Sequence, residues 1–248
     1  MTLPPIEHRP SPNHSVRAAG KPVDILLLHY TGMISDERAI AWLCDPESAV
    51  SSHYFVFEDG RIARLVDEGR RAWHAGQSTW AGETDINSHS IGIEVANPGH
   101  EFGYRPFPEV QIEATIALCR DILGRHPIPP QRVLAHSDVA PLRKDDPGEL
   151  FPWPRLHAAG IGHWVPPAAI VAGSTLRAGD AGAAVAIFRS KLRGYGYGLD
   201  PADRYDPLTE AAVRAFQRHF RPEKVDGLAD PSTLATLDRL IATLPAKG

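Results

Sequence analysis

The pattern of apolar residues changes once along the chain, and this change limits how the chain can fold. Before it, short β-rich apolar runs surround one helical stripe, and after it the stripes are helical. It falls at Val165-Pro166-Pro167 and Ala172-Gly173-Ser174, which are typical of a connection between domains. The length of 248 residues also exceeds the roughly 100–200 residues of one ordinary domain. We expect a first domain over residues 1–165, a linker over 166–175 and a second domain over 176–248.

The first part of the chain predicts an α/β domain. The run from Val23 to Leu28 is short and apolar, which is typical of a buried strand and places His29 at its carboxyl end. Asp59-Gly60 is a hairpin turn signal between two further β-rich runs. Interleaved strands and helices with a local hairpin indicate a mixed central β-sheet flanked by helices. The predicted elements are strands over residues 23–28, 53–57, 61–66, 90–96 and 132–135 and a helix over residues 108–125.

The second part of the chain predicts a small three-helix all-α domain. Its apolar residues recur at helical spacing in three stretches. Two of the helix starts are encoded locally, because Asp206-Pro207 and Asp230-Pro231 each place a capping carboxylate before a proline suited to the first turn. The stripes are Val185, Phe188 and Leu192, then Val213, Phe216 and Phe220, then Leu234, Leu237 and Ile241.

Charge and hydropathy exclude some classes of partner. The formal net charge of -4 argues against nonspecific electrostatic binding to nucleic acid or anionic lipid. The longest apolar run falls far below the roughly 18–20 residues that span a bilayer, so we expect no membrane insertion. The first twenty residues lack the apolar stretch of a secretory signal, which predicts a cytoplasmic protein for the sequence as given.

Histidine is abundant and cysteine is scarce, with 12 and 2 residues. A bound metal would therefore be held by nitrogen and oxygen. His136 follows a predicted strand, Asp146 stands later on the same loop, and His29 ends another strand. Three such ligands plus a water are typical of a catalytic zinc. Each residue taken alone is more often a buried, hydrogen-bonded histidine or part of a turn.

Short motifs stand in a defined order along the first domain. They are Leu28-His29-Tyr30-Thr31, Ser52-His53-Tyr54-Phe55-Val56, Arg71-Ala72-Trp73-His74-Ala75-Gly76, Ser90-Ile91-Gly92-Ile93-Glu94, and His136-Ser137-Asp138-Val139-Ala140-Pro141 with Lys144-Asp145-Asp146-Pro147-Gly148. Together they resemble the type 2 N-acetylmuramoyl-L-alanine amidases, zinc enzymes related in fold to peptidoglycan-recognition proteins. The second domain resembles the three-helix peptidoglycan-binding module appended to cell-wall hydrolases.

The resemblance implies a zinc ion (Zn2+) bound by His29, His136 and Asp146. It also implies two catalytic side chains, Glu94 and Lys144. Glu94 would accept a proton from the attacking water and pass it to the leaving nitrogen. Lys144 would stabilise the oxyanion that forms on the carbonyl oxygen.

The remaining candidates follow from their positions in the motifs. Asp146 is preferred over Asp145 as the ligand because the family ligand directly precedes Pro-Gly. Asp138 is expected to hydrogen-bond within its loop or to support a ligand. The expected substrate contacts are Trp73, for which a place in the core is an equal alternative, His74 and, more weakly, Asn97.

The expected function is hydrolysis of the amide between N-acetylmuramic acid, or its 1,6-anhydro form, and L-alanine of the stem peptide. The partners would be soluble muropeptides or the intact sacculus. A wall-binding module favours the periplasm or cell envelope, whereas the amino-terminal sequence favours the cytoplasm. A noncatalytic peptidoglycan-recognition module is the alternative, opposed by the complete set of ligands and Glu94. A cysteine nucleophile is a poorer third option, because neither Cys44 nor Cys119 lies in a motif.

Overall fold

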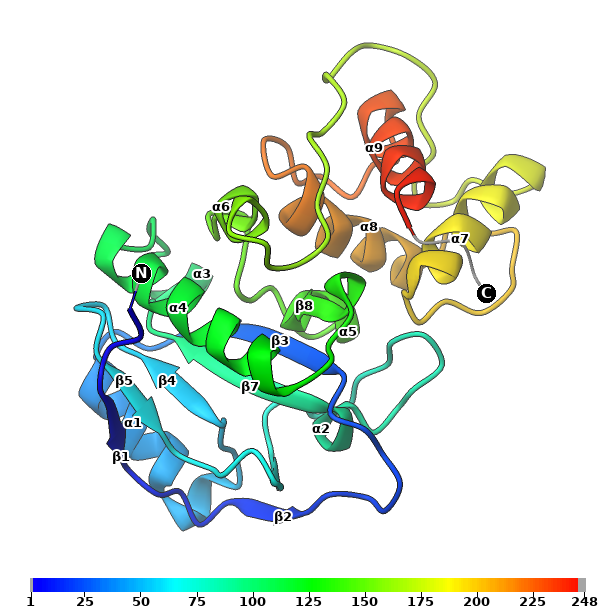
Figure 1. The fold of residues 1–248 in the computed structure, drawn as a ribbon. Coiled ribbons are helices and arrows are strands. Elements are labelled where there is room, and N and C mark those ends of the chain that lie inside the picture. Colours follow the sequence, from blue (N-terminus) through cyan, green and yellow to red (C-terminus); the bar gives the residue numbers. More distant parts are fainter. Residues whose placement is uncertain (1, 245–248) are drawn as a thin grey trace.

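The first domain folds around a six-stranded mixed sheet in a computed structural model that describes residues 2–244 (Figure 1). The strand order is β1-β5-β4-β7-β3-β8, and each neighbouring pair is parallel except the β4–β5 hairpin. Strands β2 and β6 form a separate antiparallel pair. The strands are β1 (Ile6–His8), β2 (His14–Val16), β3 (Ile25–Tyr30), β4 (Tyr54–Val56), β5 (Ile62–Arg64), β6 (Arg70–Ala72), β7 (Ser90–Val95) and β8 (Val133–Ala135). The predicted mixed sheet is confirmed.

Strand β3 lies near the middle of the sheet and is buried from Ile25 to His29. Side chains alternate along a strand, so Leu27 and His29 share one face while Leu26 and Leu28 point to the other. The β3–β7 register pairs His29 with Glu94. Residues paired in this way project from the same face, so these two polar side chains lie side by side on the sheet.

Helices cover both faces of the sheet (Figure 1). Helix α4 (Glu109–Arg125) packs its predicted stripe, including Ile112 and Cys119, against the face that carries Leu26 and Leu28. Helix α1 (Asp36–Cys44) packs on the opposite face. The shorter helices are α2 (Ile86–His89), α3 (Gly99–Phe102), α5 (His136–Val139) and α6 (Trp153–Ala158), with 3-10 turns at Pro46–Ser48 and Pro130–Arg132.

The second domain consists of α7 (Ala183–Tyr195), α8 (Pro207–Phe220) and α9 (Pro231–Ala242) within the described residues. Both predicted caps are confirmed, because Asp206 accepts the Thr209 backbone N–H at 2.8 Å and Asp230 accepts the Thr233 N–H at 2.8 Å. Between residues 2 and 244, the helices are too short or too polar to cross a membrane.

The segment expected to link the domains is packed against the second one. The Ala168 N–H donates to Thr236 Oγ1 at 3.0 Å, and the Ser232 hydroxyl donates to the Ala168 carbonyl at 2.6 Å. The apolar core is also continuous across the boundary, since Leu27 and Trp80 belong to the same buried cluster as residues of α7, α8 and α9. The two domains therefore form one packed body, with α8 next to α5 (Figure 1).

Candidate metal centre and active site

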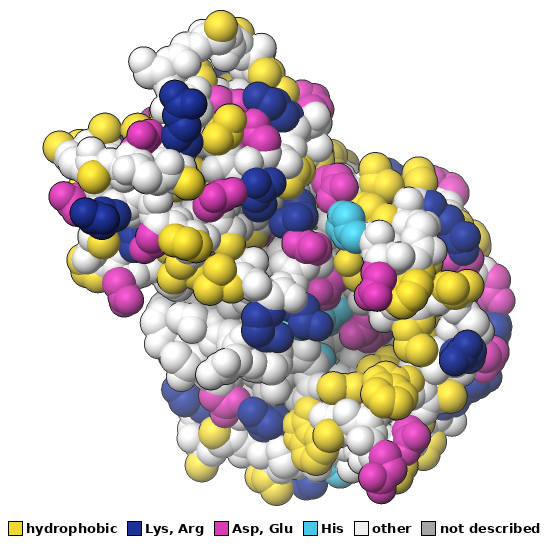
Figure 2. All heavy atoms as spheres, turned by 180° about the vertical axis from the view of Figure 1, so that it is seen from behind, with side chains coloured by type: hydrophobic (Ala, Val, Ile, Leu, Met, Phe, Trp, Pro, Cys, Tyr) yellow, Lys and Arg dark blue, Asp and Glu magenta, His cyan; other side chains and the backbone are white. Residues whose placement is uncertain are grey.

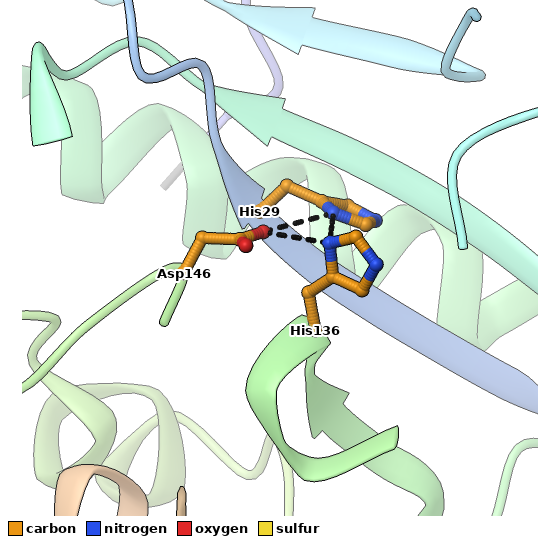
Figure 3. Close-up of side chains that lie close together, drawn as sticks. All are labelled: His29, His136 and Asp146. Carbon is orange, nitrogen blue, oxygen red and sulfur yellow. Dashed lines mark hydrogen bonds and ion pairs between the residues drawn. The ribbon is translucent and has the colours of Figure 1, made fainter. Parts of the chain in front are cut away.

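Three side chains from separate elements meet at one point above the sheet (Figure 3). His29 comes from the end of β3, His136 opens α5, and Asp146 lies on the loop that follows. His29 Nδ1 lies 3.0 Å from His136 Nδ1 and 3.1 Å from Asp146 Oδ2, and His136 Nδ1 lies 3.0 Å from the same oxygen. All three residues are buried. The sheet and the loop after β8 thus bring together the three residues that the motifs singled out.

The hydrogen bond made by His136 Nε2, the ring nitrogen that faces away from the cluster, shows which of the two ring nitrogens carries the proton. Nε2 lies 3.0 Å from the carbonyl oxygen of Ala75, which can only accept. Nε2 is therefore the donor, and in this tautomer the free lone pair lies on Nδ1. That lone pair points toward the other two residues of the cluster.

A chain of hydrogen bonds determines the proton position on His29 in the same way. The Ser90 hydroxyl donates to the Ile86 carbonyl at 2.7 Å, so its oxygen accepts from His74 Nε2 at 3.2 Å. His74 Nδ1 is then an acceptor, and His29 Nε2 donates to it over 3.0 Å. His29 Nδ1 is left unprotonated. A donor bond from the outer nitrogen is the arrangement that metal-ligating histidines adopt.

Two imidazole lone pairs and a carboxylate oxygen therefore converge without a proton between them. Burial and the neighbouring His136 lower the pKa of His29 to about 4, which keeps its ring neutral near pH 7. Zinc bonds of about 2.0–2.1 Å in a tetrahedron separate neighbouring ligand atoms by about 3.3–3.4 Å, close to the spacing here. The donor set fits a zinc ion that keeps one position open.

Glu94 stands beside this cluster, opposite His29 in the β3–β7 register. Its Oε2 is buried and has no hydrogen-bond partner among the described residues. Burial and the negative charge of Asp146 raise the pKa of Glu94 well above its usual value, while Lys144 acts in the other direction. Lys144 is half-buried on the loop before Asp146, and its charge acts on both Glu94 and His29. The carboxyl group is thus unusually ready to hold a proton.

The molecular surface is hollowed where histidine and acidic side chains are exposed together (Figure 2). Lys and Arg side chains border this hollow on one side, and hydrophobic side chains border it on another. A site that combines a metal-type cluster, a proton acceptor and a cation at its edge is suited to hydrolysis of a polar amide.

His74 occupies a different place from the one that the sequence suggested. It is buried behind His29, and both of its ring nitrogens are engaged, so it orients a ligand and has no nitrogen left for a substrate. Room for its ring comes from Gly92, where an added Cβ would lie 2.5 Å from His74 Nδ1. A glycine inside a strand was the sequence signal for this close approach, and the motif analysis did not use it.

Asn97 also differs from its expected role as a substrate contact. It is 1% exposed, its amide donates to the Arg105 carbonyl at 2.8 Å, and its oxygen accepts the Gly99 N–H at 3.1 Å. It therefore stabilises the turn after β7. Trp73 is half-buried, with Nε1 donating to Ser15 Oγ at 3.3 Å, and a substrate contact there stays a prediction.

The two neighbouring carboxylates of the loop point in different directions. Asp146 faces the histidines, whereas Asp145 is exposed and pairs with Arg218 of α8 at 2.8 Å. Asp138 is fully buried and accepts the Ala135 N–H at 2.8 Å, as expected for a residue that supports the loop. Its further partners lie in the second domain and were not visible in the sequence.

Comparisons with known proteins find relatives that cover most of this chain. AmiD of Escherichia coli strain K12, an N-acetylmuramoyl-L-alanine amidase, is 39% identical over 237 residues, covering 91% of this chain and 84% of AmiD. A structure of AmiD with the substrate anhydro-N-acetylmuramic acid-L-Ala-D-γ-Glu-L-Lys matches with a TM-score of 0.76 and 38% identity, covering 90% of this chain and 91% of that one. AmpDh3 of Pseudomonas aeruginosa in complex with anhydromuramic pentapeptide matches with a TM-score of 0.75 and 33% identity, covering 92% and 94%.

Family models divide the chain at the same place as the change in its apolar pattern. A model described as a putative peptidoglycan binding domain matches residues 181–237. The N-acetylmuramoyl-L-alanine amidase model matches residues 19–149, which include the buried cluster and Glu94. Because this model matches more than half of the chain and AmiD is 39% identical over 91% of it, the chain belongs to the N-acetylmuramoyl-L-alanine amidase family.

Proposed function

We propose that this chain is a zinc-dependent amidase that hydrolyses the bond between N-acetylmuramic acid, or its 1,6-anhydro form, and L-alanine. The observation that carries this proposal is the convergence of two imidazole lone pairs and one carboxylate beside a Glu94 oxygen that has no hydrogen-bond partner within residues 2–244. The muramyl peptides bound to AmiD and AmpDh3 support the substrate class.

The chemistry divides between the ion and the side chains. His29, His136 and Asp146 would hold the zinc, which when bound lowers the pKa of water to about 7 and polarises a carbonyl group. Water oxygen forms a bond to the lactyl carbonyl carbon, and the carbon–nitrogen bond to L-alanine breaks. Glu94 takes the proton of the attacking water on its carboxylate and delivers it to the departing nitrogen. Lys144 offsets the negative charge that develops on the carbonyl oxygen.

The products are a free muramyl carboxylate and a stem peptide with a free amino terminus. Both soluble anhydro-muropeptides and intact sacculi contain the required bond. We propose the soluble fragments as the first substrates to test, because the ligands in the AmiD and AmpDh3 complexes are anhydromuramyl peptides. Rapid release of peptide from sacculi would instead favour action in the cell envelope, and preference for soluble fragments would favour the cytoplasm.

Chelation and one substitution test this function together. Zinc-free protein should release no stem peptide from anhydromuramyl-tripeptide, and added zinc should restore release, followed by mass spectrometry. Glu94→Gln keeps the size of the side chain but cannot take a proton, so it should bind zinc and lose roughly 10²–10⁴-fold in rate. Glu113→Gln, at an exposed position of α4 on the opposite face, is the matched control and should keep full activity. Cleavage by zinc-free protein would contradict the proposal.

A further inference from the structure

The carboxylate of Asp138 joins the two domains directly behind the metal cluster. Its Oδ2 accepts the backbone N–H of Ala135, which immediately precedes His136, at 2.8 Å. Its two oxygens also accept the Tyr197 hydroxyl and His219 Nδ1, each at 2.7 Å. Asp138 is 0% exposed. A buried carboxylate with three donors is rigid, and here two of the three donors come from the helical domain, defined as residues 176–244.

Tyr197 is held firmly in the position from which it donates. Its ring packs edge-on against Trp80 of the first domain at 5.1 Å, and the Ala81 N–H donates to the neighbouring Gly196 carbonyl at 2.7 Å. A side chain at Gly196 would overlap the Trp80 ring. Burial and the charge of Asp138 raise the pKa of Tyr197 well above its usual value, so its hydroxyl keeps its proton.

His219 is equally constrained. Its ring stacks on Trp153 of the first domain at 3.7 Å and on Phe220 at 3.9 Å. His219 is 3% exposed, and Nδ1 must carry a proton because its partner Asp138 is a carboxylate. The stack leaves the ring one orientation in which this hydrogen bond forms.

The residue before His219 contacts the second ligand-bearing segment. Arg218 pairs with Asp145, the neighbour of the ligand Asp146, at 2.8 Å. The two ligand-bearing segments are themselves joined, because the Ser137 N–H donates to the Asp146 carbonyl at 3.0 Å. Arg218 and His219, which are adjacent in α8, thus contact the neighbouring segments that carry His136 and Asp146.

We propose that the helical domain is a positioning part of the metal site, acting through Tyr197 and His219 on Asp138 and through Arg218 on Asp145. This inference rests on the proposed zinc function. The helical domain holds His136 and Asp146 at the spacing that zinc requires, in addition to any contact that it makes with the cell wall. Tyr197, His219 and Arg218 are positioning residues, since none of them belongs to the metal cluster.

Support of this kind has a measurable signature in metal affinity. Removing a partner behind a metal ligand typically weakens metal binding by about 10–100-fold. Removing a contact that only joins the two domains would lower the stability of the protein and leave the zinc affinity of the folded site unchanged. Zinc affinity therefore separates positioning from simple packing.

A matched pair of tyrosines provides the test. Tyr197 and Tyr205 are both buried in the helical domain, and both hydroxyls donate at 2.7 Å, to Asp138 and to the Gly227 carbonyl. Tyr197→Phe should weaken zinc binding by about 10-fold, measured by competition with a chelating dye, and lower kcat on a soluble muropeptide with little change in KM. Tyr197→Phe and Tyr205→Phe should lower the melting temperature by similar amounts, because each loses one buried hydroxyl. Tyr205→Phe should leave zinc affinity unchanged.

A second variant keeps the inference testable if Tyr197→Phe folds poorly. Arg218→Gln removes the ion pair with Asp145 and the longer one with Glu149, at 3.8 Å, while both hydrogen bonds from the helical domain to Asp138 remain. It should weaken zinc binding several-fold. Equal zinc affinity in the parent, Tyr197→Phe and Arg218→Gln would overturn the inference while leaving the amidase proposal intact. A parent protein that neither binds zinc nor cleaves muropeptide would refute the proposed function instead.

Discussion

Gly92 offers a stringent test of the hydrogen-bond chain behind the metal cluster. A Cβ at this position would lie 2.5, 2.6 and 2.7 Å from three ring atoms of His74. The strand backbone itself tolerates alanine, so Gly92→Ala acts through this overlap. The His74 ring must move, and the bond that His29 Nε2 donates to it over 3.0 Å must lengthen or break.

The magnitude follows from overpacking and from the loss of ligand support. Forcing extra volume into a filled core costs about 1–3 kcal/mol, which in a protein of this size lowers the melting temperature by about 2–4 °C per kcal/mol. Loss of the bond that orients His29 should weaken zinc binding by about 10–100-fold. Gly124→Ala in α4 is the control, because no atom of residues 2–244 outside the helix's own nearby backbone lies within 4 Å of a Cβ added there. It should stabilise the protein by about 0.5–1 kcal/mol.

Differential scanning calorimetry and dye competition for zinc measure the two effects separately. His74→Ser removes the ring that a Cβ at Gly92 would overlap. In that background Gly92→Ala should therefore cost less stability than it does in the parent, while zinc affinity stays low. If Gly92→Ala melts and binds zinc like the parent, His74 does not orient His29 as the hydrogen-bond chain implies.

Two further predictions concern acid stability and the loop after the ligand. Burial alone would raise the pKa of Glu68, but hydrogen bonds from Arg125 and His126, among others, lower it to about 2. The stabilisation by the Glu68 carboxylate is therefore complete above about pH 4.5 and is lost as the pH falls toward about 2. Glu68→Gln should lower the free energy of unfolding in urea by about 2–3 kcal/mol at pH 7 and by progressively less in acid. A difference that does not change with pH would contradict this assignment. Gly148 has a φ of +83°, and a Cβ there would overlap the Tyr104 hydroxyl. Gly148→Ala should therefore lower the free energy of unfolding by about 1–3 kcal/mol and shift unfolding to a lower urea concentration. An unchanged unfolding midpoint would show that the loop relaxes freely.

The sequence predicted the elements whose local signals agree with their packing. The apolar run ending at His29 became β3, the Asp59-Gly60 turn became the β4–β5 hairpin, and the Asp-Pro pairs became the starts of α8 and α9. Short segments without a strong period, such as β1, β2 and β6, were not predicted, because their pairing partners define them.

The candidate site divides in the same way. The resemblance indicated His29, His136 and Asp146 correctly as a cluster, because each stands in a short motif. His74 and Asn97 stand in or near equally clear motifs, yet their burial and hydrogen bonds depend on segments distant in sequence. Two of the three donors to Asp138, Tyr197 and His219, lie 59 and 81 residues away along the chain, and nothing in the local sequence around either of them indicates that contact.

The apolar core that crosses the domain boundary limits how this chain can be cut or recombined. Trp80 is 1% exposed and lies against Tyr195 and Tyr197 of the helical domain, and Val139 belongs to the same cluster. A fragment ending near residue 165 would expose these side chains to solvent, and contiguous exposed apolar patches favour aggregation. A foreign domain grafted in place of residues 176–244 would lack the side chains that cover this surface and those that bind Asp138. The exchangeable unit is the joined pair of domains, although the boundary between the two family models invites a cut between them.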